Sequence, residues 1–110
     1  MNPETEALKD RTKKFALDVL RFVRTLPATD EHRDIGGQLR RSGTGVGANY
    51  RATCRSRSRV EFIARINVAL EETDESAFWL EVLVEGGLAS GQMARDLFDG
   101  ECQEFRVWAS

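Results

Sequence analysis

The sequence predicts an all-α protein built as a bundle of four helices. Apolar residues recur at intervals of three and four residues through four segments, which places them on one face of a helix in each segment. Helix-start and helix-stop residues separate these segments, and no segment alternates convincingly with the period of two that a strand requires. We therefore expect helices over residues 3–26, 31–57, 59–85 and 91–108, within a single domain spanning residues 1–110.

The first helix is bounded by Asn2-Pro3, a pair that favours a helix start, and by Pro27, which ends a helix. Its apolar residues form one stripe for burial: Leu8, Phe15, Val19, Phe22 and Leu26.

The second helix contains the run SGTGVGANYRATCRSRSR at residues 42–59, whose glycines resemble a phosphate-binding loop. Such a loop follows a strand, and a P-loop has a lysine directly after its glycines, but this segment has neither feature. Residues instead step by four and three through the glycines: Ile35, Leu39, Ser42, Val46, Asn49 and Thr53. The glycines therefore lie inside a helix, for which Asp30 is the expected N-cap.

Gly36, Gly43 and Gly47 share a stripe beside the core face of this helix. The helix contains five glycines in all, which cost roughly 4 to 5 kcal/mol of intrinsic helix propensity relative to alanine. A stripe of small residues lets another backbone approach closely, so we expect either tight helix packing or a subunit contact here. The three glycines are therefore candidate oligomer-interface residues.

The third helix opens after Ser58 and Glu61, which have the spacing of a capping box, and ends at Gly86-Gly87. Its core stripe comprises Phe62, Ile66, Ala69, Thr73, Ala77, Leu80 and Val84. Four large apolar residues fall outside that stripe: Val68, Phe78, Trp79 and Val82. Either the fourth helix covers some of them, or they form a self-association surface, for which they are the candidate residues.

The fourth helix is expected to start after Ser90 and to contain Gly100, which weakens it. Its inward residues are Met93, Leu97, Phe105 and Trp108.

Composition narrows the class of protein. The chain of 110 residues has 41% hydrophobic residues, and no stretch approaches the roughly 20 apolar residues of a membrane span. Two cysteines give neither a disulfide framework nor a metal-binding pattern, and the opening MNPETEAL lacks the features of a signal peptide. We expect a reduced, cytoplasmic protein without a membrane segment.

Charge is distributed unevenly along the chain, although the formal net charge is only −2. Residues 33–65 contain eight arginines and two acidic residues, whereas residues 66–110 contain two arginines and ten acidic residues. Arg33, Arg40, Arg51 and Arg55 lie opposite the apolar stripe of the second helix. The candidate nucleic-acid-binding residues are Arg40, Arg51, Arg55, Arg57 and Arg59. The alternatives are that acids of the third helix, such as Glu71 and Glu75, neutralise these arginines within one chain or between subunits.

No catalytic constellation is supported. Glu71, Glu72 and Glu75 lie close together in sequence, but a di-metal carboxylate site requires a Glu-x-x-His motif on two helices, and the only histidine is His32. We therefore expect no enzymatic activity, no metal and no cofactor.

Several separate motifs, in order, resemble a known family. They are QLRRSG at residues 38–43, VGANYRA at 46–52, RSRVEFIAR at 57–65, LEETDES at 70–76 and WLE at 79–81. With them the chain resembles, over roughly residues 8–90, the four-helix bundle proteins named for intervening sequences of bacterial 23S rRNA genes. The resemblance implies an up-down-up-down antiparallel bundle that assembles as a ring, typically a homopentamer, with no established enzymatic activity. Related bundles are accessory proteins of retroelement reverse transcriptases and carry basic surfaces for nucleic acid.

Three functions remain open at this stage, and the third, a metal-dependent enzyme, has the weakest support in the sequence. The arginine flank favours a ring-forming accessory protein that binds RNA or DNA, whereas the sequence pI near 5.5 favours an oligomeric scaffold that binds only protein.

Overall fold

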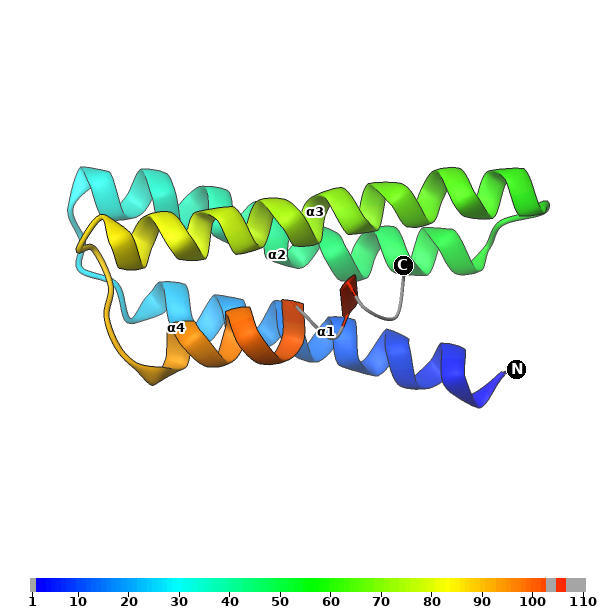
Figure 1. The fold of residues 1–110 in the computed structure, drawn as a ribbon, viewed down its shortest axis with the longest axis horizontal. Coiled ribbons are helices and arrows are strands. Elements are labelled where there is room, and N and C mark those ends of the chain that lie inside the picture. The colour runs from blue at the N-terminus through cyan, green and yellow to red at the C-terminus, as the bar shows by residue number, and fades with distance from the viewer. Residues whose placement is uncertain (1, 103–104, 107–110) are drawn as a thin grey trace.

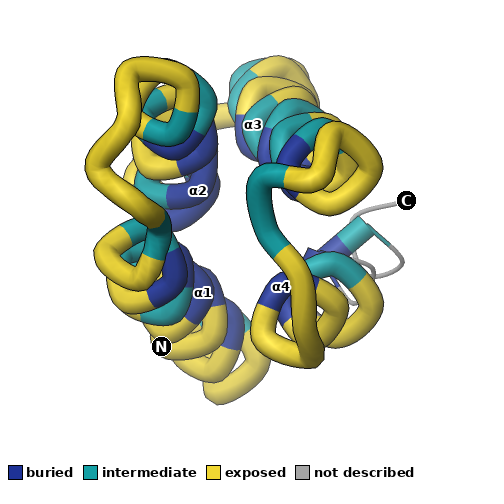
Figure 2. Tube along the Cα trace, turned by 90° about the vertical axis from the view of Figure 1, so that its left-hand side faces the viewer, coloured by how far each residue is buried: buried dark blue, intermediate teal, exposed yellow. Residues whose placement is uncertain are grey.

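The computed structural model describes residues 2–102 and 105–106 and shows an up-down-up-down antiparallel four-helix bundle (Figure 1). Three long helices, α1 (Pro3–Arg24), α2 (Asp30–Cys54) and α3 (Arg59–Glu85), are followed by the short α4 (Gln92–Asp96) and the π-helix η1 (Leu97–Cys102). Residues 105–106 are also helical, and the described part of the chain contains no strand. Seen along the bundle, α1 and α2 stack on one side and α3 and α4 on the other (Figure 2).

Two helix starts agree with the expected caps. The Asn2 side chain accepts a hydrogen bond from the Glu4 backbone N–H at 2.8 Å, and the Ser58 hydroxyl accepts one from the Glu61 N–H at 3.1 Å. Glu61 completes the capping arrangement by accepting the Arg57 N–H at 3.2 Å. The expected bounds of the third helix, 59–85, are those of α3.

Other helix ends differ from expectation. The N-cap of α2 is Thr29 rather than Asp30, because the Thr29 hydroxyl accepts the His32 N–H at 3.2 Å. The N-cap of α4 is Gly91 rather than Ser90, and it makes no side-chain cap hydrogen bond. Helices α1 and α2 end at Arg24 and Cys54, two and three residues before the expected ends.

The expectation of one regular helix over 91–108 is wrong in the described residues, since the α-helix ends at Asp96 and continues as a π-helix to Cys102. The buried residues are Ala94, Leu97, Cys102 and Phe105. The step of five from Leu97 to Cys102 matches the extra residue of a π turn. Met93, expected to face inward, is 49% exposed, and Trp108 lies outside the described residues.

The core consists mainly of the predicted stripes. Those buried as predicted are Leu8, Phe15, Val19, Phe22, Leu39, Ser42, Val46, Thr53, Ile66, Ala69, Thr73, Ala77 and Leu80. The ends of the third stripe differ, because Phe62 and Val84 are partly exposed. Helix α4 and η1 run beside only part of the length of α3, and Phe62 lies near the opposite end (Figure 1).

Candidate nucleic-acid interface and self-association face

The glycine stripe of α2 packs against α1 within the chain. A Cβ at Gly43 would lie 2.9 Å from Val19 Cγ2, and a Cβ at Gly47 would lie 3.3 Å from the backbone oxygen of Thr12. A Cβ at Gly36 would lie 3.2 Å from Leu26 Cδ1, and all three glycines are buried. The sequence allowed either tight helix packing or a subunit contact for these glycines, and the structure shows tight packing against α1. The remaining candidate residues for an oligomer interface are the apolar residues of α3.

The eight arginines of residues 33–65 divide into two groups. Three of them form ion pairs: Arg33 with Asp30 at 3.7 Å, Arg65 with Glu61 at 2.7 Å, and Arg41 with both Glu75 and Glu72. The other five are exposed and form no ion pair with any carboxylate in the described part of the chain. These five are the predicted set, Arg40, Arg51, Arg55, Arg57 and Arg59.

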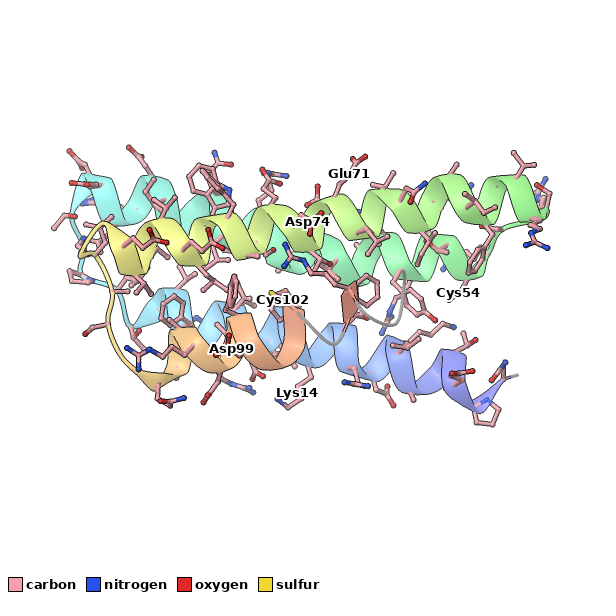
Figure 3. All side chains as sticks on the ribbon, viewed as in Figure 1. Lys14, Cys54, Glu71, Asp74, Asp99 and Cys102 are labelled. Atoms are coloured by element: carbon pink, nitrogen blue, oxygen red, sulfur yellow. The ribbon has the colours of Figure 1, made fainter. Side chains whose placement is uncertain are left out.

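The alternative was that acids of α3 neutralise the candidate arginines, but two of these acids pair with another arginine. Glu75 and Glu72 both pair with Arg41, whose Nη1 lies 3.6 Å from Glu72 Oε2. The hydrogen bond that Arg41 donates to Glu75 raises the pKa of Arg41, and burial raises the pKa of Glu72 despite the attraction of Arg41. Glu71 points away from the bundle (Figure 3). Within the chain, the predicted arginines are therefore not neutralised by Glu71 or Glu75.

The predicted arginines form a track rather than a pocket. Arg40, Arg51 and Arg55 lie along one exposed flank of α2, and Arg40 and Arg51 are separated by about 16 Å of helix rise. Arg57 lies in the turn between α2 and α3, and Arg59 is the first residue of α3, directly after the N-cap Ser58. The structure thus places the five side chains along the flank and around its end, without bringing them to one point.

Helix α3 carries exposed apolar residues on its outer surface. Val68 is 41% and Phe78 is 53% exposed, whereas Trp79 and Val82 are half-buried. The Phe78 and Trp79 rings contact edge to face, with centroids 5.0 Å apart. Helix α4 lies instead along Leu80 and Val84, where it lines a shallow groove, and so it leaves Val68 and Phe78 uncovered.

Sequence reasoning missed two exposed apolar residues of α3, Val60 and Ile63. Val60 is 80% exposed and lies 18 residues before Phe78, which is five full turns of an α-helix. That spacing was visible in the sequence and puts Val60 on the same side of α3 as Phe78, with the exposed Glu71 between them.

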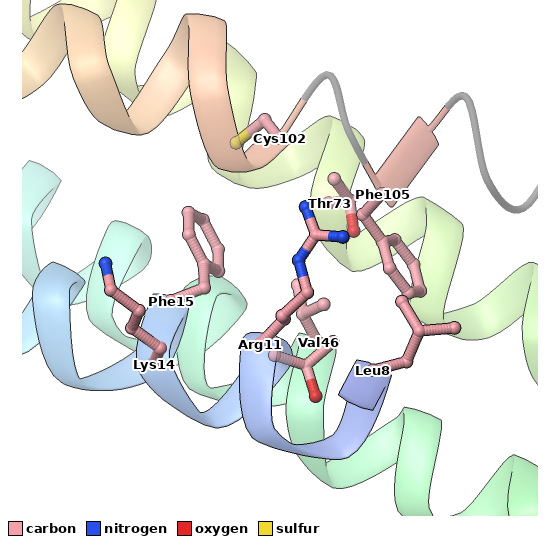
Figure 4. Close-up of a pocket in the computed structure, with 9 residues that line it drawn as sticks. Leu8, Arg11, Lys14, Phe15, Val46, Thr73, Cys102 and Phe105 are labelled. Atoms are coloured by element: carbon pink, nitrogen blue, oxygen red, sulfur yellow. The ribbon is translucent and has the colours of Figure 1, made fainter. Parts of the chain in front are cut away.

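A pocket of about 220 Å³ opens between α1 and the C-terminal elements (Figure 4). Apolar side chains, including Leu8, Phe15 and Phe105, line it, with Arg11 and Lys14 among the lining residues. Among the described residues, no group of three His, Cys, Asp or Glu side chains is placed to hold a metal ion.

His32 has a structural position. Its Nε2 lies 2.9 Å from the Leu88 carbonyl oxygen and its Nδ1 lies 2.6 Å from the Thr29 hydroxyl. The imidazole therefore ties the start of α2 to the loop after α3. Within residues 2–102 and 105–106, no helix combines the length and apolar character needed to cross a membrane.

The fold and its surfaces define the class of protein, an all-α four-helix bundle with one basic flank and one exposed apolar face. The chain belongs to the 23S rRNA-intervening sequence protein family, whose model matches residues 5–108. This confirms the resemblance found in the sequence motifs.

A solved structure has the same fold. It is the crystal structure of a protein with unknown function from the S23 ribosomal protein family of Bacteroides thetaiotaomicron VPI-5482. It is 28% identical in sequence, with a TM-score of 0.83, and the match covers 92% of this chain and 93% of that chain. No curated protein matches the sequence.

Proposed function

We propose that this protein is a non-enzymatic, ring-forming bundle that binds nucleic acid through the arginine track of α2 and the following turn. The observation that carries the proposal is the division of the eight arginines. The five that lack a carboxylate partner in the described residues are all on this flank or at this turn, so their charge is available to a polyanion.

Binding follows from counterion release. Each phosphate neutralised by an arginine releases condensed cations, so affinity depends steeply on salt, and several contacts act together. One subunit offers a short track, and a ring repeats it around its circumference. The arginines contact phosphates, which carry no sequence information, so we expect tolerance of sequence.

Assembly uses the outer face of α3, where Val68 and Phe78 are exposed and Trp79 and Val82 flank them. An exposed apolar face of this kind is typical of an interaction surface. The family resemblance favours a homopentamer.

The nucleic-acid proposal is tested by replacing Arg51, Arg55 and Arg57 together with glutamine. We expect gel shifts of RNA and DNA to be lost and the salt slope of log K to fall by about two to three. The matched control replaces Arg21, Arg41 and Arg106 with glutamine, because each forms an ion pair with a carboxylate. Absence of any shift by the wild-type protein at about 50 mM salt, where such binding is strong, contradicts the proposal.

The alternative is an oligomeric scaffold that binds protein only. It is favoured by the sequence pI near 5.5 and by the ten acidic residues among residues 66–110. It replaces the first proposal if the wild-type protein binds no nucleic acid at low salt.

Assembly is tested by Phe78→Asp, which places a charge on the exposed apolar face of α3. We expect light scattering to show an oligomer for the wild type and a monomer for the variant, because burying an unpaired carboxylate at an interface is strongly unfavourable. Met93→Asp is the control, since Met93 is exposed to a similar extent, 49% against 53%, on α4. A monomeric wild type at micromolar concentration rules out the assembly.

A further inference from the structure

Helix α1 provides a second row of cations beside the arginines of α2. Thr12 and Val23 contact α2 at Gly47 and Gly36, respectively. Lys13 and Arg24 are the residues that follow them, and one residue turns a helix by about 100°, which carries these side chains from the contact to the adjacent surface. Both are exposed, and neither forms an ion pair with a described carboxylate.

The arginines of α2 also border the line of contact between α1 and α2, which we call the seam. Arg40 and Arg51 each lie four residues after one of the two contacting glycines, Gly36 and Gly47, and residues four apart are neighbours on a helix surface. Each close contact between the helices therefore has a cation on both sides, Lys13 with Arg51 and Arg24 with Arg40. The two cation pairs are about 16 Å apart along the helices.

The arrangement places like charges along both edges of one helix contact. Like charges repel, and no described carboxylate pairs with any of the four cations. A polyanion lying along the seam would relieve this repulsion at both pairs.

The seam lacks the groups that bind single strands. Proteins that hold single-stranded nucleic acid stack its bases on exposed aromatic side chains. The aromatic residues of α1 and α2 are Phe15, Phe22 and Tyr50, which are only 4%, 3% and 2% exposed, respectively. The seam therefore offers cations for phosphates but no exposed Phe, Tyr or Trp ring on which bases could stack.

We propose that Lys13, Arg24, Arg40 and Arg51 form a surface for double-stranded nucleic acid and discriminate against single strands. This inference rests on the proposed function, because it shares Arg40 and Arg51 with the arginine track. Packed helices lie about 8–10 Å apart, so two cation rows can face phosphates of two strands. A duplex presents one charge per about 1.7 Å of axis, against about 3.4 Å for each strand, so it offers the denser target.

The experiment measures binding by fluorescence anisotropy to a labelled DNA duplex, an RNA duplex and the corresponding single strands. At about 100 mM salt we expect a duplex to bind at least about tenfold more tightly than its single strands. The DNA and RNA arms show which duplex is preferred. The double variant Lys13→Gln with Arg24→Gln should weaken duplex binding by about tenfold or more and lower the salt slope by about two.

A matched control exists on the same helix. Lys14 and Arg21 are also one lysine and one arginine, but they pair with Asp18 at 2.6 and 3.0 Å and line a hollow toward α4. Lys14→Gln with Arg21→Gln should leave duplex binding unchanged.

The outcomes separate the two proposals. Equal or tighter binding of single strands, or equal effects of the two double variants, overturns the duplex surface while the arginine track stands. Failure of the wild-type protein to bind any of the probes removes both. A loss of duplex affinity confined to the Lys13 and Arg24 variant supports the seam.

Discussion

The two flanks of α2 are held by different kinds of contact. Toward α1, the helix presents Gly36, Gly43 and Gly47, at which a Cβ would lie only 3.2, 2.9 and 3.3 Å, respectively, from the nearest atom. Toward α3, it presents polar groups: the Ser42 and Ser76 hydroxyls are hydrogen-bonded at 2.9 Å, and Arg41 pairs with Glu72 and Glu75. The first flank is determined mainly by shape, whereas the second combines polar pairing with close packing at Gly45, whose Cβ would lie 2.5 Å from Glu72 Oε2.

This difference separates two adjacent arginines. Arg41 is turned toward α3, where two carboxylates neutralise it, whereas Arg40 lies on the α1 side and pairs with no described carboxylate. Glycine packing requires no charged partner across the contact, so the cations along its edges keep their charge. The same feature that brings α1 and α2 close thus leaves the seam basic.

The largest expected effect comes from breaking the shape-determined flank with Gly47→Leu. A Cβ there would already lie 3.3 Å from the backbone oxygen of Thr12, which cannot move away as a flexible side chain can. The remaining atoms of leucine would force α1 and α2 apart, and we expect the free energy of unfolding in urea to fall by roughly 3 kcal/mol or more.

Gly37→Leu is the control for this prediction. Its Cβ would meet only Arg40 Nη2, the end of a flexible side chain, at 3.7 Å. Leucine has the higher helix propensity, so stability should stay constant or rise by up to about 0.8 kcal/mol. Equal destabilisation by both substitutions would show that the glycines are not required for close packing.

The three long helices could be predicted because their signals are local. The caps at Asn2 and Ser58 and the apolar steps of three and four lie within single segments of sequence. The fourth helix could not, because the step of five from Leu97 to Cys102 belongs to a π turn, whose extra residue is not encoded in an α-helical period. Thr29 and Asp30 are both good N-caps, so only the geometry of the turn selected Thr29.

The site was predictable in part for a similar reason. Helical periodicity placed Arg40, Arg51 and Arg55 on one exposed flank of α2, and the structure agrees. Their lack of ion pairs depends on the register between α2 and α3, which brings Glu72 and Glu75 to Arg41 instead. Periodicity within one helix does not specify the register between two helices. For the same reason, the position of the α1 cations beside the glycines of α2 became apparent only in the folded structure.

The smallest expected effect tests the polar flank with Glu72→Gln. Burial raises the pKa of Glu72 above its ordinary value of 4.5, so the folded protein binds the proton more tightly than the unfolded chain. The stability that this provides is fully present below the unfolded pKa and is lost as pH rises through the higher folded pKa. Glutamine does not titrate, so the free energy of unfolding of the variant relative to the wild type should increase from pH 4 to pH 7. The change should stay below about 1 kcal/mol, since solvent screens this partly exposed pair. Urea unfolding at both pH values measures the change, and a constant or decreasing difference would show that Arg41 outweighs burial at Glu72.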